Sequence, residues 1–311
     1  MRRLTLNISC NHITLFGNSL IQYTLYGVDK EKVVLELTQK QYTLMESRAK
    51  RAFYIRCPKE LILKEIDSAP NSKALKAITE KYYLCDACDF NDINIYGVKR
   101  LLKAVVEILY RYPRLRSKLC FIGTHHAMEK MLIKLEQGDD VIIKDLNLQY
   151  ICSIDNAKKV GRIVHHIVAK TIEQHEIYIA TAINAYGLLD AVLLDKNDYE
   201  GYAYLDVISN MRESEAMGFH PKGCNTPESV VYHELGHLID NMCNLSESYE
   251  FKSYYKTLSR YDIEKGLSQY ALENDKEFIA EAFAEYMSNP KPRLIAMKVG
   301  ELLDRAYGSL T

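Results

Sequence analysis

The sequence predicts an α+β protein in which a small N-terminal α+β domain, residues 1–90, precedes a larger and mainly helical domain, residues 91–311. Three observations predict this class. Short apolar runs separated by Asn, Gly and Asp fill residues 4–38, as expected for the strands of a small sheet. Longer segments with apolar residues three and four positions apart follow, as expected for helices that bury one face. Runs rich in Ile, Val, Tyr and Ala between those helices predict a few further strands, one of them at a sheet edge.

Turn-forming residues divide the N-terminal domain into its expected elements. Four apolar runs, LTLNI, HITLF, LIQYTLYG and KVVLELT, are separated by turn-forming residues and are expected to pair as strands. AFYIRC, residues 52–57, is expected to form one more strand. Residues 71–84 have helical spacing and begin with Asn71 and Ser72, either of which can cap a helix. These residues therefore predict a helix, which together with the strands makes residues 1–90 a small α+β module.

Helices dominate the rest of the chain. Residues 96–112 have the spacing of an amphipathic helix, which is expected to end before Pro113 because proline cannot continue a helix. Further helices are expected at residues 124–137, 156–174, 226–244, 275–287 and 292–306. Strands are expected at residues 118–123, in IYIATAINAYG (177–187) and in YAYLDVISN (202–210).

Composition and charge limit the kinds of function. The chain has 311 residues, of which 48% are hydrophobic and 26% charged, and these values are typical of a globular protein. The formal net charge is −1, with basic residues in excess before residue 120 and acidic residues in excess after it. Proteins that bind nucleic acid usually carry a stronger basic bias, so nucleic acid is not expected as a partner.

The N-terminus and the cysteines indicate a compartment. The apolar run that a signal peptide needs after Arg2 and Arg3 is interrupted by polar residues. No apolar stretch reaches the roughly 18 residues that a membrane helix needs. The eight cysteines are dispersed without the spacing of a disulfide framework. We therefore expect a cytoplasmic protein with reduced thiols and no membrane partner.

The segment VVYHELGHLID, residues 230–240, contains the pattern H-E-x-x-H at His233, Glu234 and His237. Residues four apart share one face of a helix, so the two histidines can present their imidazoles to a single metal ion. Glu234 can reach the open coordination position and take a proton from a water molecule there. The alternative is a solvated helix that carries two histidines incidentally.

The residues around the motif favour a helix. Thr226 is a candidate N-cap, Pro227 suits the first helical position, and Glu228 lies in the first turn, where a negative charge is stabilising. This context places His233 and His237 on one side of a helix that runs over residues 226–244.

A third ligand is expected, because catalytic zinc sites usually have three protein ligands. Glu277, Glu281 and Glu285 are four residues apart among apolar neighbours, on one face of a predicted helix. Like charges at this spacing repel, and buried carboxylates without a partner are costly, so a divalent cation would offset both effects. Spacing alone leaves open whether Glu277 is the ligand or Glu281, with Glu285 behind it. Asp240 as the third ligand and an acidic stripe facing solvent are further alternatives.

The combination of H-E-x-x-H with a glutamate from a later helix resembles the gluzincin zinc metallopeptidases. HELGHLIDN (233–241) followed by YALENDKEFIAEAF (270–283) is similar, more closely, to the peptidase domain of the anthrax lethal factor family. It is also similar to related zincin-like domains encoded by phages, in which HPKG (220–223) is a familiar motif. The resemblance covers about residues 200–290, and residues 1–90 resemble no family that we recognise.

The resemblance implies a zincin-like catalytic domain with Zn²⁺ as its cofactor. Carried over residue by residue, it implies that His233, His237 and Glu277 are the zinc ligands. It implies that Glu234 is the general base. An origin in a phage or another mobile element is also implied.

Three further residues take supporting roles by the same resemblance. Glu281, one turn after Glu277, is implied to accept a hydrogen bond from a ligand histidine and so to fix its orientation. Tyr270 matches a tyrosine that donates to the oxyanion or to the leaving group. Asp240 matches an acidic residue three positions after the second histidine of the motif.

The function implied is a zinc-dependent endopeptidase that acts on a peptide or protein substrate, with its oligomeric state left open. In zincin folds an edge strand beside the active-site helix pairs with the extended substrate, and residues 202–210 are the candidate for that edge. One alternative is a non-catalytic, phage-associated structural or interaction protein that retains the fold. Another is a metal-dependent hydrolase that acts on other bonds. Glu234 and Tyr270 argue against the non-catalytic alternative, because metal binding alone needs neither.

Cysteines and basic residues give weaker signals. Cys85 and Cys88 form a single C-x-x-C without a second pair, so structural thiols are favoured over a zinc knuckle or a redox pair. Cys224 could place a thiolate at the open metal position. A basic segment between residues 99 and 118 could bind a polyanion, although a solvated helix face is the simpler interpretation.

Overall fold

A computed structural model describes residues 8–310 except 16–17, 27–31, 39–56, 92, 147, 149–151, 174–179, 184–189 and 196–202. The chain forms two compact units. Unit 1 comprises Met1–Pro58, Lys73–Asn91 and Arg116–Asp195. Unit 2 comprises Lys59–Ser72, Asp92–Leu115 and Lys196–Thr311. This division differs from the single boundary expected near residue 90, since residues 116–195 group with the N-terminal segments.

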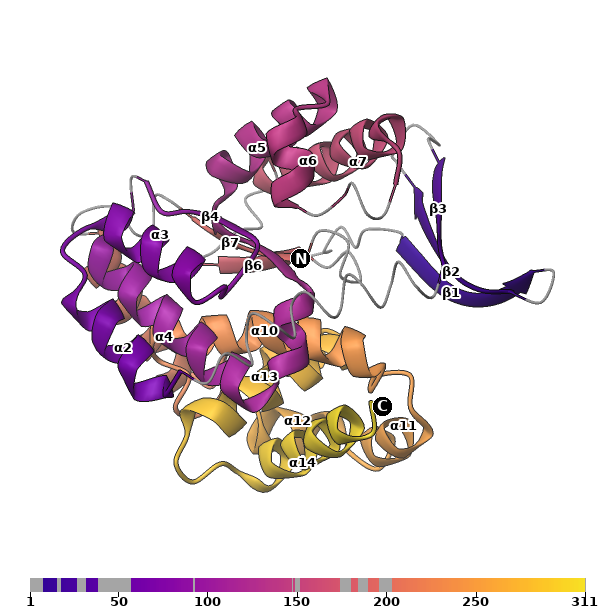
Figure 1. Ribbon diagram of the computed structural model, residues 1–311. Coiled ribbons are helices and arrows are strands. Elements are labelled where there is room, and N and C mark those ends of the chain that lie inside the picture. Colours follow the sequence, from indigo (N-terminus) through magenta and orange to yellow (C-terminus); the bar gives the residue numbers. More distant parts are fainter. Residues whose placement is uncertain are drawn as a thin grey trace. The chain divides into compact units, whose positions relative to one another are not determined.

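Three antiparallel strands form the first sheet of unit 1, in the order β1-β2-β3 (Figure 1). They are β1 (Ile8–Leu15), β2 (Asn18–Tyr26) and β3 (Lys32–Thr38). The register pairs Cys10 with Tyr23, and Tyr23 with Leu35. The strands expected at HITLF, LIQYTLYG and KVVLELT are therefore confirmed, whereas LTLNI lies outside the described residues except for Ile8, the first residue of β1. The strand expected at residues 52–57 lies outside the described residues except for Cys57, which is not in a strand.

The second sheet of unit 1 has the order β4-β5-β7-β6. Its strands are β4 (Ala87–Asp89), β5 (Leu119–Thr124), β6 (Ala180–Ile183) and β7 (Asp190–Leu194). β4, β5 and β7 are parallel, and β6 is antiparallel to β7. Every residue of β5 and β7 is buried, as in parallel strands that are covered on both faces. The pairing of β4 with β5 explains why residues on both sides of the expected boundary share one unit.

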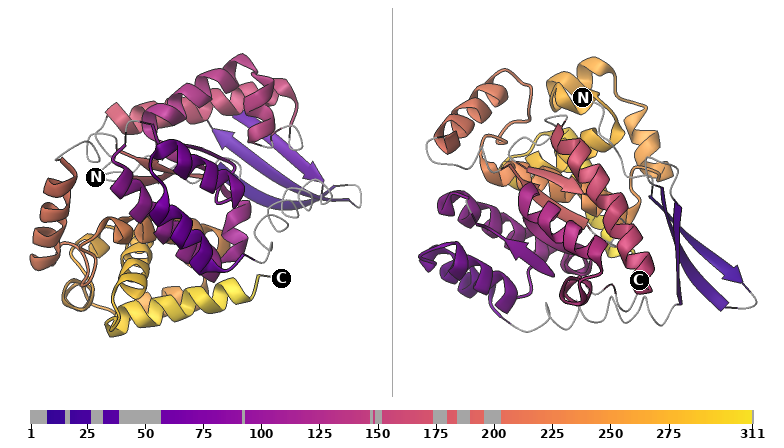
Figure 2. Two further views of the ribbon diagram at one scale, coloured as in Figure 1. Left: turned by 60° about the vertical axis from the view of Figure 1, so that its left-hand side comes forward. Right: turned by 90° about the horizontal axis from the view of Figure 1, so that it is seen from above.

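The helices of unit 1 are α3 (Ser72–Lys81), α5 (His125–Gln137), α6 (Asp140–Asp145) and α7 (Ile154–Glu173). α5 and α7 lie side by side (Figures 1 and 2), and apolar residues such as Met128, Leu132 and Val160 form their common core with Phe121 of β5. The Thr124 side chain caps α5 by accepting from Ala127 N, and the helix ends at the left-handed Gly138.

In the described residues of unit 2 all regular secondary structure is helical. Its helices are α2 (Lys59–Ser68), α4 (Ile95–Arg111), α9 (Ala203–Ala216), α10 (Pro227–Cys243), α11 (Tyr249–Tyr255), α12 (Arg260–Gly266), α13 (Asp275–Ser288) and α14 (Leu294–Gly308), with the short 3₁₀ helices η1 (Pro113–Ser117) at its border and η3 (Tyr270–Leu272). α10 packs against α13 and α4, and α13 packs against α14 (Figure 1). The helices expected at residues 96–112, 226–244, 275–287 and 292–306 are confirmed to within a few residues as α4, α10, α13 and α14.

The strand expected at residues 202–210 is wrong, because α9 occupies Ala203–Ala216. Val207 and Met211 are buried and four positions apart, whereas Leu205 is exposed, so the apolar residues follow a helical and not an alternating period. The described residues of unit 2 include no strand, and the edge-strand sheet expected beside the metal-binding helix is not found there.

None of the helices formed by the described residues is both long enough and apolar enough to cross a membrane.

Candidate metal centre

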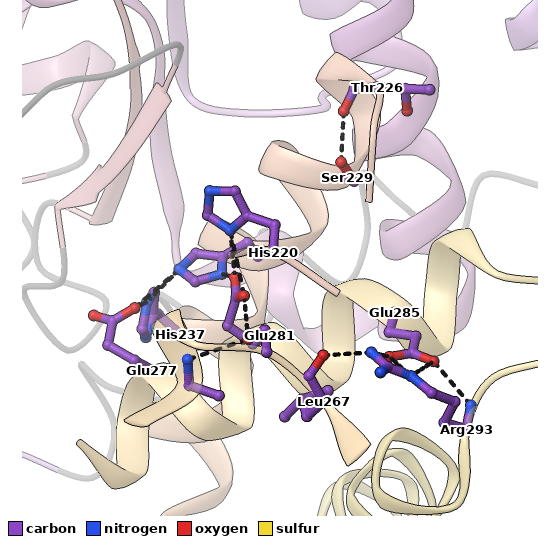
Figure 3. A network of polar contacts seen from close by, with 12 residues as sticks. His220, Thr226, Ser229, His237, Leu267, Glu277, Glu281, Glu285 and Arg293 are labelled. Carbon is purple, nitrogen blue, oxygen red and sulfur yellow. Dashed lines mark hydrogen bonds and ion pairs between the residues drawn. The ribbon is translucent and has the colours of Figure 1, made fainter. Parts of the chain in front are cut away.

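α10 begins and ends where its sequence predicts. Thr226 precedes the helix in an extended conformation and Pro227 occupies its first turn. The Thr226 side chain makes no capping bond, but its carbonyl oxygen accepts from Ser229 N at 2.9 Å and from Ser229 Oγ at 2.6 Å (Figure 3). The helix ends at Asn244, which has a left-handed φ of 54°. The middle of α10, which carries the H-E-x-x-H motif, is buried throughout.

α13 supplies the buried carboxylates. Asn274 caps it, with Oδ1 accepting from Lys276 N at 3.0 Å and from Glu277 N at 2.9 Å. Glu277, Glu281 and Glu285 are all buried, as their apolar neighbours predict. An ionised carboxylate in this setting needs a compensating partner: Glu277 and Glu281 share His233, and Glu285 pairs with Arg293.

Three ligand atoms converge between α10 and α13. His233 Nε2 lies 3.1 Å from Glu277 Oε2. His237 Nε2 lies 3.3 Å from the same oxygen, and Figure 3 shows His237 beside Glu277. The two Nε2 atoms are 3.2 Å apart. A tetrahedral zinc ion bound at about 2.0–2.1 Å would hold its ligand atoms about 3.3–3.5 Å from one another. The donor set of two imidazoles and one carboxylate, and its spacing, therefore fit one small divalent cation.

Glu281 contacts the opposite nitrogen of the first histidine. His233 Nδ1 lies 2.9 Å from Glu281 Oε1. A carboxylate can only accept, so this bond places a proton on Nδ1, and in the neutral ring it leaves Nε2 as the nitrogen available to a metal ion. The sequence left open whether Glu277 or Glu281 is the third ligand. In the structure Glu277 lies next to both Nε2 atoms, whereas Glu281 contacts the Nδ1 atom of His233.

Glu285 and Asp240 have partners away from the three ligand atoms. Arg293 binds Glu285 through Nε, at 3.0 and 3.1 Å, and through a second guanidinium nitrogen at 2.7 Å (Figure 3). Asp240 Oδ1 accepts from Ser246 N at 2.7 Å, just beyond the end of α10. Burial raises the pKa of Asp240. Neither residue joins the metal-binding group formed by the described residues.

The charges of the metal-free site depend on one another. Burial alone would lower the pKa of His233, but hydrogen bonds to Glu277 and Glu281 raise it to about 10. Burial would raise the pKa of both carboxyls, but the histidines hold that of Glu277 well below its usual range and lower that of Glu281 to about 2. At neutral pH the metal-free site therefore contains a protonated His233 between two ionised carboxylates.

Metal binding at pH 7 is expected to release about one proton, because the imidazole must be neutral to bind a metal. The proton leaves His233, whose pKa of about 10 keeps it charged at pH 7, whereas the glutamates are already ionised. The apparent affinity should therefore rise as the pH increases toward 10. Calorimetric titration with zinc in two buffers of different ionisation enthalpy measures the release. An observed enthalpy that is the same in both buffers would contradict it.

Gly236 allows the two helices to approach at the metal site. A Cβ atom at this position would lie 3.0 Å from Phe283 Cδ1 and 3.4 Å from Ala280 Cα, both on α13. The position falls between His233 and His237 on α10. A larger side chain would therefore push the histidines away from the helix that carries Glu277.

Gly236→Val is expected to lower the free energy of unfolding by about 1–3 kcal/mol through overpacking, and to weaken zinc binding. Thermal unfolding and zinc titration measure the two effects. Gly308→Val is the matched control, because a Cβ at Gly308, the last residue of α14, meets nothing within 4 Å. Equal stability of the two variants would show that α10 and α13 do not need this contact.

The two residues assigned to chemistry both lie near the first ligand, His233. Glu234 follows His233 on α10 and is buried. Tyr270 is half-buried in η3, with its ring centroid 6.0 Å from that of His233. The structure thus brings Glu234 and Tyr270 to the same end of unit 2 as the ligands, from separate segments.

His220 and Ser268 belong to the site but were not assigned from the sequence. His220 Nδ1 lies 3.3 Å from both oxygens of Glu281 (Figure 3), and Ser268 Oγ donates to Glu281 Oε2 at 2.8 Å. His220 opens the HPKG segment that the resemblance includes, so this motif was the one available signal. Nothing in the sequence around Ser268 distinguishes it from other serines.

The cysteines whose side chains the structure describes lie outside the metal-binding group. Cys224 is buried, and burial followed by the charges of Glu281 and Glu285 raises the pKa of its thiol. Cys85 and Cys88 are buried free thiols, and burial raises the pKa of Cys85. These properties agree with structural thiols.

Much of the basic segment is paired within unit 2. Lys103 forms an ion pair with Asp67, Arg100 Nε lies 2.6 Å from Glu228 Oε1, and Arg111 lies 2.6 Å from Asp304 Oδ2. This pairing favours a structural role over a polyanion site.

The geometry of these side chains is the basis for assigning a function. Comparisons of the chain with models of protein families, with curated proteins and with solved structures give no match.

Proposed function

We propose that the protein is a zinc-dependent metallopeptidase that hydrolyses internal bonds of a peptide or protein substrate. The observation that carries the proposal is the convergence of His233 Nε2, His237 Nε2 and Glu277 Oε2 within 3.1–3.3 Å of one another. Two imidazoles and one carboxylate form a ligand set that catalytic zinc sites use, with one position left for water or substrate. The resemblance to the gluzincins supports zinc as the metal.

The chemistry divides between the metal and the chain. A zinc ion held there supplies Lewis acidity toward a substrate carbonyl and toward water. Glu234 takes the proton of the attacking water and passes it to the leaving amine. Tyr270 donates a hydrogen bond to the oxygen of the scissile carbonyl as negative charge develops on it. Glu281 keeps His233 in the ligand tautomer during these steps.

The competing candidate is a non-catalytic protein that uses the metal for stability only. A structural zinc site is closed by a fourth protein ligand and needs no general base beside it. Among the described residues the metal-binding group has three members, and Glu234 and Tyr270 stand next to it. These features favour catalysis.

Turnover of an unfolded protein is the test of the proposal. Zinc-loaded protein should cleave a generic unfolded substrate such as reduced casein, a chelator should stop cleavage, and added zinc should restore it. Stoichiometric zinc together with no cleavage across a broad peptide library would favour the structural role instead.

Tyr270→Phe is expected to reduce kcat by about 10²–10³ with little change in KM, because only the hydroxyl that stabilises the transition state is lost. Zinc content should be unchanged, since the tyrosine is not a ligand. Steady-state kinetics on any cleaved peptide, with zinc measured in the same samples, checks both statements. Tyr249→Phe is the matched control, because Tyr249 is an exposed tyrosine outside the site. Unchanged kcat in Tyr270→Phe would remove the role assigned to Tyr270 and leave the metal centre in place.

A further inference from the structure

Glu281 is the point at which three separate segments of unit 2 meet. Its Oε1 lies 2.9 Å from His233 Nδ1 of α10, and its Oε2 accepts from Ser268 Oγ at 2.8 Å. His220 Nδ1, from the loop before α10, lies 3.3 Å from both oxygens (Figure 3). The carboxylate is 2% exposed, so its orientation depends on these three side chains and not on water.

The loop that carries His220 also holds the loop that carries Tyr270. Gln269 N donates to Gly218 O at 3.0 Å, and Tyr270 N donates to Phe219 O at 3.1 Å. The rings of His220 and Tyr270 meet edge to face with their centroids 5.6 Å apart. His220 therefore touches both the carboxylate behind the metal ligand and the tyrosine assigned to the transition state.

The other end of the loop is fixed by α9. Glu215 accepts from Gly223 N at 2.7 Å and from Asn225 Nδ2 at 2.5 Å. Gly223 has a φ of 84° and a Cβ there would lie 3.2 Å from Asn289 Cα, so only glycine suits this turn. With both ends anchored, the loop presents His220 in a defined place.

We propose that His220 is a positioning residue of the metal centre. Through Glu281 it keeps the imidazole of His233 in its ligand orientation, and through its ring it keeps Tyr270 beside that ligand. Without His220, Glu281 would share its two oxygens between Ser268 and His233 alone and could rotate away from His233. The part of the inference that concerns Tyr270 rests on the proposed function, and the part that concerns the metal ligand does not.

The test measures zinc affinity and kinetics in His220→Leu and His220→Asn. His220→Leu should weaken zinc binding about 10- to 100-fold, as loss of a partner behind a metal ligand does, and should lower kcat more than it raises KM. His220→Asn keeps an N–H donor near the place of Nδ1 and should restore most of both. His126→Leu, at an exposed histidine of α5, is the control and should change neither. Circular dichroism confirms folding, and His220→Ala replaces His220→Leu if the latter fails to fold.

A double-mutant cycle separates action through Glu281 from a direct effect. In a Glu281→Gln background, His220→Leu should weaken zinc binding by much less than in the wild type, because the carboxylate that transmits its effect is gone. Additive losses would overturn the proposal. Unchanged zinc affinity in His220→Leu would also overturn it, including when kcat falls, since that result would mean direct contact with substrate. A zinc-loaded wild type that cleaves no peptide would defeat the proposed function, and the affinity measurements would still decide the role of His220.

Discussion

Glu234→Gln is expected to retain zinc and fold but to lose peptide turnover by about 10²–10⁴, the contribution of one general base. Glutamine has the size and polarity of glutamate but cannot take a proton from water. Glu234 is buried on α10 directly after the ligand His233, and the metal-binding group of the described residues does not include it. Its loss should therefore appear in the chemical step and not in metal affinity.

The measurement is kcat and KM for the variant with zinc quantified in the same samples. Glu273→Gln is the matched control, because Glu273 is an exposed glutamate that lies before α13, four residues from Glu277 in the sequence. Wild-type kcat in Glu234→Gln would rule out the peptidase mechanism. Loss of zinc from Glu234→Gln would instead mean that the carboxylate is part of the metal site.

His233→Ala is expected to abolish zinc binding and, with it, all turnover. The substitution removes one of three converging ligand atoms and leaves Glu277 and Glu281 without their shared partner. Removing one member of a buried ion pair costs about 3–5 kcal/mol, so the variant should also unfold at a lower temperature. His233→Gln keeps a polar side chain and serves as the second variant if the first does not fold.

Metal analysis of the dialysed variants measures the effect, with His126→Ala as the control at an exposed histidine. Near-stoichiometric zinc in folded His233→Ala would place the metal elsewhere. Loss of zinc from Glu277→Gln but not from Glu285→Gln would further distinguish the ligand from the carboxylate that Arg293 binds.

The helices of the metal centre could be predicted from sequence because their signals are local. Thr226, Pro227 and the H-E-x-x-H spacing mark α10, and the glutamates among apolar residues mark α13. The choice between Glu277 and Glu281 could not be made from spacing. It depends on which nitrogen of His233 each carboxylate meets, and only the packing of α10 on α13 determines that.

Contacts between distant residues account for what the sequence did not predict. His220 and Glu281 are 61 residues apart, and no local pattern joins them. Residues 202–210 contain many residues that favour strands, but the burial of Val207 and Met211 on one face fits a helix. The boundary expected near residue 90 does not account for the parallel pairing of β4 with β5, because the two strands lie on either side of that boundary in the sequence.

Anomalous X-ray diffraction at the zinc absorption edge, from crystals grown with zinc, tests the central claim most directly. A single strong anomalous peak is expected between α10 and α13, about 2.0–2.2 Å from His233 Nε2, His237 Nε2 and a carboxylate oxygen of Glu277. A peak bound by other residues, or no peak at this position in zinc-soaked crystals, would contradict the account.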